Sequence, residues 1–118
     1  MNNDEENIVW FAMRAPFCKE LEAKRLLDKQ AIENFVPMCY KVFEKNNKKR
    51  KELVPAVHNL IFVRTTRRII RETKRTVPFL QYITMPDAGK NSPIIVPHIQ
   101  MQQFNSVSRL LNERLVYL

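Results

Sequence analysis

The sequence contains a single glycine among 118 residues, which excludes the glycine-rich loops that hold phosphate groups in nucleotide-binding enzymes. Its two cysteines, Cys18 and Cys39, lie far apart in the chain. Its two histidines, His58 and His98, show no metal-ligand spacing. We therefore expect two reduced thiols, no metal and no cofactor.

Long apolar runs are also missing. No run approaches the roughly 20 residues needed to span a bilayer, and residues 1–7 are polar and acidic rather than a secretory signal. These absences predict a cytoplasmic protein without a membrane partner. Apolar residues make up 45% of the chain, which at this length indicates one domain with one core.

Groups arranged for catalysis are scarce as well. A nucleophile or base needs a neighbouring group that orients it, and the isolated cysteines and histidines offer none. Glu20 and Glu22 lie two positions apart and point to different sides of a helix. We therefore expect a binding protein and not an enzyme.

Positive charge is abundant but uneven. The chain carries 20 Lys and Arg against 12 Asp and Glu, a net charge of +8. Residues 45–75 hold 11 basic against 2 acidic side chains, whereas residues 1–44 hold 6 against 8. A basic region confined to the middle third favours a polyanionic partner such as nucleic acid.

The apolar pattern predicts an α+β fold in the order β-α-β-β-α-β-α, with helices packed on an antiparallel sheet. We expect residues 1–7 to be a disordered lead-in. The predicted elements are a strand over 8–13, a helix from Pro16 to about Gln30, strands over 35–43 and 60–64 on either side of a charged tip at 44–52, a helix over 66–76, a strand over 79–85, a loop over 87–93, a short extended piece over 94–96 and a helix opened by Pro97.

The helix predicted over 66–76 has two different sides. Residues at spacings of three and four are expected to face the sheet, namely Thr66, Ile69, Ile70, Thr73 and Val77. The outer side then carries Arg67, Arg68, Arg71, Lys74 and Arg75. Since like charges on one helix repel, this side has either an acidic partner or full solvation.

These motifs in this order resemble the N-terminal (NGN) domain of the NusG family of transcription elongation factors, over about residues 8–108. The resemblance is carried by Trp10-Phe11-Ala12-Met13, by Glu20, Ala23 and Leu27, by Phe35-Val36-Pro37, by the basic hairpin tip, by the strand from His58 to Arg64, and by Ile95-Val96-Pro97 followed by Met101 and Phe104. It implies an NGN-like sandwich that binds RNA polymerase.

Two departures refine the resemblance. His58-Asn59-Leu60 stands where the family commonly has Pro-Gly-Tyr, so the chain looks more like the specialised paralogues of the RfaH or UpxY kind. Those act as operon-specific antiterminators, often for surface polysaccharide genes. The family's C-terminal KOW barrel is missing, and we expect a truncated chain in which residues 109–118 are a tail or the start of a linker.

The resemblance also implies site residues. The patch for the β′ clamp helices of RNA polymerase would be Val57, Leu60, Phe62, Tyr82, Met101 and Phe104. The contact with the gate loop of the β subunit would use Thr65, Thr66 and Arg67. Exposed non-template DNA would meet Arg14, Lys29, Gln30, Arg67, Arg68 and Arg71. Upstream DNA would be approached by a mobile hairpin tip with Lys48, Lys49, Arg50 and Lys51.

The implied mechanism is mechanical: a monomer bridges the clamp and the gate loop, and so suppresses pausing and termination. Two alternatives stay open. An RNA-binding module of the RRM type shares the β-α-β-β-α-β order but needs exposed stacking aromatics on its sheet. A structural interaction domain whose basic side is incidental would lack salt-dependent nucleic-acid binding. Phe62 and Phe104 could also be ordinary core residues.

Overall fold

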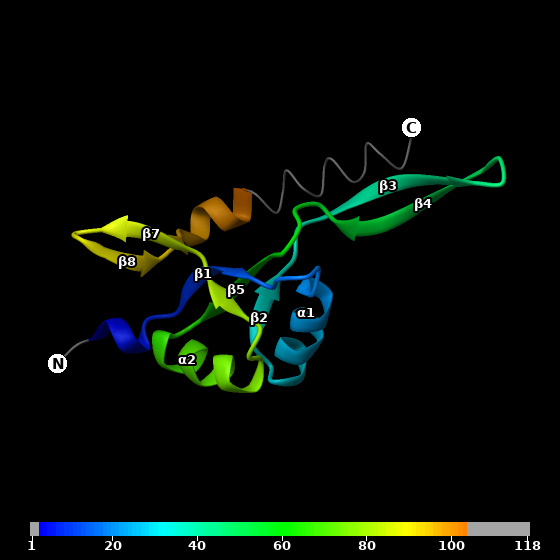
Figure 1. Cartoon of the computed structure of the whole chain (residues 1–118). Coiled ribbons are helices and arrows are strands. Elements are labelled where there is room, and N and C mark those ends of the chain that lie inside the picture. Colours follow the sequence, from blue (N-terminus) through cyan, green and yellow to red (C-terminus); the bar gives the residue numbers. More distant parts are fainter. Residues whose placement is uncertain (1–2, 104–118) are drawn as a thin grey trace.

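The computed structural model describes residues 3–103 and confirms the α+β class with an antiparallel sheet flanked by helices (Figure 1). The central sheet has the strand order β2-β5-β1-β6, and β9 also pairs with β1. Its elements are η1 (Asn3–Glu6), β1 (Val9–Arg14), α1 (Glu20–Lys29), β2 (Glu33–Phe35), β3 (Met38–Lys45), β4 (Lys48–Pro55), β5 (Leu60–Thr65), α2 (Arg67–Thr76), β6 (Gln81–Tyr82), β7 (Thr84–Asp87), β8 (Lys90–Pro93) and β9 (Ile95–Val96), followed by helical residues 98–103. No helix within this range is long and apolar enough to cross a membrane.

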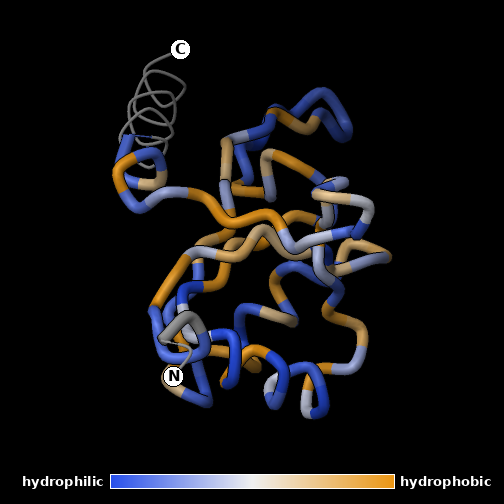
Figure 2. Tube along the Cα trace, turned by 90° about the vertical axis from the view of Figure 1, so that its left-hand side faces the viewer, coloured by the Kyte–Doolittle hydropathy of each residue, from blue (hydrophilic) through white to orange (hydrophobic). Residues whose placement is uncertain are grey.

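The sheet has a different cover on each side. Because side chains alternate along a strand, Phe11 and Met13 of β1 point to one side and Trp10 and Ala12 to the other. Helices α1 and α2 cover the side of Phe11 and Met13, and helical residues 98–103 lie on the opposite side (Figure 1). Figure 2 shows hydrophobic residues concentrated on the strands between these layers.

Helix α2 matches its prediction closely. It begins after Thr66, whose hydroxyl accepts a hydrogen bond from the Ile69 N–H at 3.1 Å and so caps the helix. Ile70, Thr73 and Val77 are buried against the sheet, as the spacing predicts. The stretch from Thr66 to Thr76 thus combines a good cap with one apolar side.

Helix α1 begins later than predicted. Phe17 and Cys18 have positive φ angles of 61° and 58°, which a right-handed helix cannot contain, so the prediction that Pro16 opens the helix is wrong. A residue distant in the sequence stabilises this turn, because the Cys18 N–H donates a hydrogen bond to Asn59 Oδ1 at 2.9 Å. A contact between residues 41 positions apart is not visible in the local pattern.

The charged hairpin also differs from its prediction. Strand β2 ends at Phe35 and pairs with β5, whereas β3 and β4 pair only with each other. Pro37 interrupts the run, since it has no N–H to donate to a ladder. The expected charged loop is instead a regular ladder that continues to Lys45 and Lys48.

A two-residue turn closes this β3–β4 ribbon. Asn46 and Asn47 have φ angles of 55° and 62°, as the tight hairpin turns with two left-handed residues require. Charged side chains are tolerated along the ribbon because both of its sides are exposed over most of its length. Lys48 to Lys51 therefore lie on a strand and not in a loop.

The region after α2 contains two strands more than expected. The strand predicted over 79–85 is divided into β6, which joins the sheet, and β7, which pairs with β8. The predicted loop over 87–93 is the second half of this hairpin, turning at Ala88 and Gly89 with positive φ. Strand β9 and the helix after Pro97 are confirmed. Phe104 and the expected tail at 109–118 lie outside the described residues.

Candidate binding surfaces

The side of the sheet opposite α1 and α2 is here called the open face. Its buried residues are Trp10, Ala12, Phe62 and Met101, and its partly buried residues are Phe35, Leu60, Ile83, Ile94 and Val96. The Trp10 indole N–H donates to His98 Nδ1 at 3.1 Å and ties the last described helix to the sheet. The rings of Phe35 and Phe62 stack at 6.4 Å between centroids. The open face is thus apolar, and residues 3–103 leave part of it uncovered.

The structure brings together only part of the predicted polymerase patch. Leu60, Phe62 and Met101 share the open face, and Val57 lies in the adjoining β4–β5 connection with 46% of its surface exposed. The structure does not bring Tyr82 together with them. Tyr82 pairs with Met13, so the alternation of side chains places it on the side covered by helices.

Tyr82 has its own partners there. Its ring lies 6.1 Å from that of Phe11, and Lys74 Nζ lies 4.1 Å from its centroid. Burial raises the pKa of its hydroxyl. Tyr82 therefore connects α2 to the sheet rather than extending the open face.

The predicted DNA-binding residues occupy separate places. Arg14 pairs with Leu60 across β1 and β5 and so lies on the same side of the sheet as the open face. Lys29 and Gln30 end α1, and Arg67, Arg68 and Arg71 belong to α2. The β4 lysines and Arg50 project on the ribbon, away from both helices (Figure 1). No single surface therefore collects them all.

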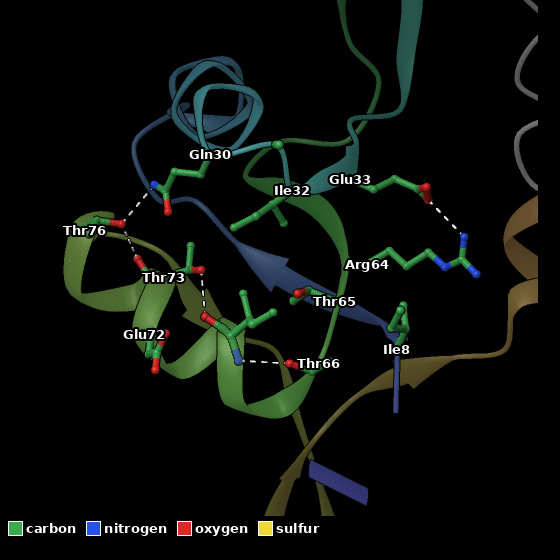
Figure 3. A pocket seen from close by; sticks show the side chains of 12 residues that line it. Ile8, Gln30, Ile32, Glu33, Arg64, Thr65, Thr66, Glu72, Thr73 and Thr76 are labelled. Carbon is green, nitrogen blue, oxygen red and sulfur yellow. Dashed lines mark hydrogen bonds and ion pairs between the residues drawn. The ribbon is translucent and has the colours of Figure 1, made fainter. Parts of the chain in front are cut away.

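A pocket of about 620 Å³ separates the end of α1, which carries Lys29 and Gln30, from helix α2 (Figure 3). It lies between the end of α1, strand β5 and helix α2, and Gln30 Nε2 donates to Thr76 Oγ1 at 3.0 Å across it. Thr65 and Thr66 line the pocket but are each only 7% exposed. Of the three predicted gate-loop residues, Arg67 has the most exposed surface.

The N-terminal acidic residues pair with α2, which the sequence did not predict. Residues 3–6, expected to be disordered, form η1 beside α2. Glu6 Oε1 lies 3.0 Å from Arg68 Nε, and Glu5 forms a two-point ion pair with Arg71. The hydrogen bond from Arg71 lowers the pKa of Glu5. The pair is therefore fully formed above the ordinary pKa of a carboxyl and is lost as pH falls through the lowered pKa.

This contact could have been suspected from charge alone. The acidic residues at the start of the chain and the five cations of α2 are complementary, although 62 and 66 positions separate the paired residues.

Among residues 3–103, no group of three His, Cys, Asp or Glu could hold a metal ion, and Cys18 and Cys39 are free thiols.

A protein-family model described as "Transcription termination factor nusG" matches residues 8–105. The chain belongs to the NusG family. A search of curated proteins gives no match. NusG-family members are transcription factors rather than enzymes, and their domains bind RNA polymerase, which is therefore the general partner.

The NusG-family motif at the start of β5 now has a structural explanation. Asn59 stands where the family commonly has glycine, and its φ is +68°, in the left-handed region that asparagine tolerates better than most residues. Its carbonyl accepts from the Ala15 N–H at 2.8 Å, and its own N–H donates to the buried Glu20 carboxylate at 2.9 Å. The side chain of Asn59 contributes as well, because its Oδ1 accepts a hydrogen bond from the Cys18 N–H.

Asn59→Ala is expected to lower the free energy of unfolding by about 2 kcal/mol, because alanine is strained at this φ and the bond to the Cys18 N–H is removed. Asn59→Gly removes the same bond without strain and should cost less than about 1 kcal/mol. Urea unfolding followed by Trp10 fluorescence measures both. Equal losses of stability in the two variants would show that backbone conformation is not the reason for asparagine here.

Proposed function

We propose that this NusG-family domain is an elongation and antitermination factor that binds RNA polymerase and non-template DNA to suppress pausing and termination. It would act as a monomer in the bacterial cytoplasm, on particular operons such as surface polysaccharide genes. The departure at His58-Asn59-Leu60 supports a specialised paralogue. The observation that carries the proposal is the apolar open face, part of which residues 3–103 leave uncovered.

The β′ clamp helices are the proposed occupant of the open face. Leu60, Ile83 and Val96 belong to its apolar cluster but are only partly buried, so a partner could cover them. Helices commonly bind by laying an apolar side on such a surface. We place Leu60 at the centre and Val57 at the edge, with Phe62 and Met101 as the floor beneath. Phe104 stays a prediction.

Nucleic acid is the proposed partner of the basic residues at the opposite side of the sheet. Arg67, Arg68 and Arg71 lie on α2, and Lys29 and Gln30 lie at the end of α1, from where they could meet the non-template strand. Of these five residues, only Gln30 lines the pocket between the two helices. Arg14 lies on the other side of the sheet and would contact DNA only near the polymerase. The gate-loop contact is proposed at the start of α2, through Thr65, Thr66 and Arg67.

Such a placement would put the clamp on one side of the domain and the gate loop and DNA on the other. Bridging them holds the clamp closed only if the domain binds the active polymerase more tightly than the paused one. The direct functional test is transcription by purified polymerase on a template with a known pause. The protein should shorten the pause, and an unchanged pause lifetime at saturating protein would contradict the proposal.

The acidic residues of η1 should compete with DNA for α2. Glu5→Gln/Glu6→Gln is expected to raise affinity for single-stranded DNA about threefold to tenfold at low salt, because Arg68 and Arg71 no longer have to leave their carboxylates. Fluorescence anisotropy with a labelled oligonucleotide measures the change. Glu22→Gln/Asp87→Asn alters net charge equally and is the control, because neither residue forms an ion pair with α2 among the described residues. An equal gain of affinity in the control would show that net charge alone explains the effect and that η1 does not compete with DNA.

The RRM-type RNA-binding module is the alternative function. Its stacking aromatics would have to lie exposed on the sheet, yet Trp10 and Phe62 are only 7% and 9% exposed on the open face. Binding of RNA that is abolished on changing Phe35 or Phe62, with no binding of polymerase, would favour this alternative.

A further inference from the structure

The β3–β4 ribbon has two sides with different chemistry. Directly paired residues share a side, so the register assigns one set of side chains to each. One side, here called the cationic side, carries Lys41, Phe43, Lys45, Lys48, Arg50 and Glu52. The other side carries Tyr40, Val42, Glu44, Lys49, Lys51 and Leu53.

Charge is concentrated on the cationic side. It holds four basic side chains and one carboxylate, and that carboxylate, Glu52, is paired with Arg50. The other side holds two basic residues, Lys49 and Lys51, and one carboxylate, Glu44, and its remaining residues are Tyr40, Val42 and Leu53. The two sides of the ribbon therefore differ in charge.

The cationic side is also hollow. A pocket of about 650 Å³ is lined by Phe43, Lys45, Asn46, Lys48, Arg50 and Glu52. All of these residues except Asn46, which belongs to the turn, come from the cationic side. Two-stranded ribbons twist strongly, and the hollow lies between side chains that project from the same side of the twisted ribbon.

An aromatic ring lies in this hollow. Phe43 is 41% exposed although it is a large apolar residue, and Lys41 Nζ lies 5.8 Å from its ring centroid. Neither of the apolar clusters of the domain includes it. A ring presented to solvent among basic side chains is the arrangement with which proteins hold unpaired bases: the ring stacks on a base and the cations contact phosphates.

We propose that the cationic side binds a short unpaired segment of nucleic acid, with one base stacked on Phe43 and the flanking phosphates on Lys45, Lys48 and Arg50. This rests on the proposed function, in which the domain binds nucleic acid. It replaces the expected contact through Lys48 to Lys51 together by a contact through Lys48 and Arg50, because Lys49 and Lys51 lie on the other side of the ribbon. Unpaired strands are favoured over duplex, since bases in a duplex are already stacked on their neighbours. The shared chemistry fits the displaced DNA strand and the transcript alike.

The test measures binding of the whole chain to oligothymidylate, oligouridylate and a duplex of equal length, by fluorescence anisotropy without polymerase. Lys48→Gln/Arg50→Gln on the cationic side is compared with Lys49→Gln/Lys51→Gln on the other side, which removes the same charge from the same strand. We expect the first pair to weaken binding of unpaired strands about tenfold or more and the second less than about threefold.

Removal of the ring separates stacking from charge. Phe43→Ala should weaken binding of unpaired strands about fivefold to a hundredfold and leave duplex binding nearly unchanged, and Phe43→Leu should not restore it. Val42→Ala truncates the neighbouring residue on the other side and is the control. Amide spectra of the ribbon confirm in each variant that the ladder is intact.

Equal losses of affinity for the two charge pairs, no effect of Phe43→Ala, or no binding of any oligonucleotide by the unaltered chain would overturn the proposal. Tighter binding of one oligonucleotide assigns the site to DNA or to the transcript. Failure here leaves the polymerase proposal standing, because substitutions on the open face test that one separately.

Discussion

Leu60→Asp is expected to weaken binding of a β′ clamp-helix fragment about thirtyfold or more while the domain stays folded. Leu60 is partly buried in the open face and is the first residue of β5. A carboxylate there would lose its water on binding without gaining a partner, and a central apolar side chain would be missing from the interface. Isothermal titration calorimetry with the fragment measures the change.

The matched control is Leu21→Asp. Leu21 lies on the outer side of α1 with 47% of its surface exposed, so the same substitution introduces the same charge on the opposite side of the sheet. It should change affinity less than about threefold, since the clamp helices do not cover α1 in this account. Equal losses of affinity in the two variants would place the interface elsewhere.

Arg68→Gln/Arg71→Gln is expected to weaken binding of single-stranded DNA about tenfold to a hundredfold at low salt. Each phosphate that a side chain neutralises on a single strand adds about 0.7 to the steepness of log affinity against log salt concentration, so removing two arginines should reduce that steepness by about 1.4. Arg25→Gln/Lys90→Gln removes the same charge from exposed residues of α1 and β8 and is the control. If the control weakens binding as much, the net positive charge of the domain attracts the DNA, and not specific contacts of Arg68 and Arg71.

The acidic residues make this prediction sharper. In the Glu5→Gln/Glu6→Gln background, the loss of affinity caused by Arg68→Gln/Arg71→Gln should be larger than in the unaltered chain, because the arginines then contribute their full attraction for DNA. A loss of the same size in both backgrounds would show that η1 does not compete with DNA.

Much of the fold could be predicted from local patterns. Strand β1 is a continuous apolar run, and α2 combines the Thr66 cap with regular burial of Ile70 and Thr73. Pro97 precedes the last described helix as expected. These elements were found because propensity, periodicity and capping agree within one short window.

The errors arose where distant residues decide local structure. The turn before α1 depends on Asn59, and the division between β2 and β3 depends on which partner each strand finds. Charged residues in the ribbon were interpreted as a loop because its two exposed sides leave no apolar alternation.

In the candidate site, too, the residues that could not be placed are those whose position depends on distant partners. The sequence identified Leu60, Phe62 and Met101, which share the open face. It could not place Tyr82 on the other side, because that depends on the pairing of Tyr82 with Met13. The charges of α2 indicate an acidic partner, but they do not identify Glu5, which lies 66 positions from Arg71.

The central claim is that the open face binds the clamp helices of RNA polymerase. An amide and side-chain NMR titration of the domain with a β′ clamp-helix fragment tests it most directly. We predict shifts centred on Leu60, Phe62, Ile83 and Met101, with the Trp10 indole among them, and unchanged signals from Tyr82 and α2. Shifts centred on α2, or none at saturating fragment, would contradict the claim.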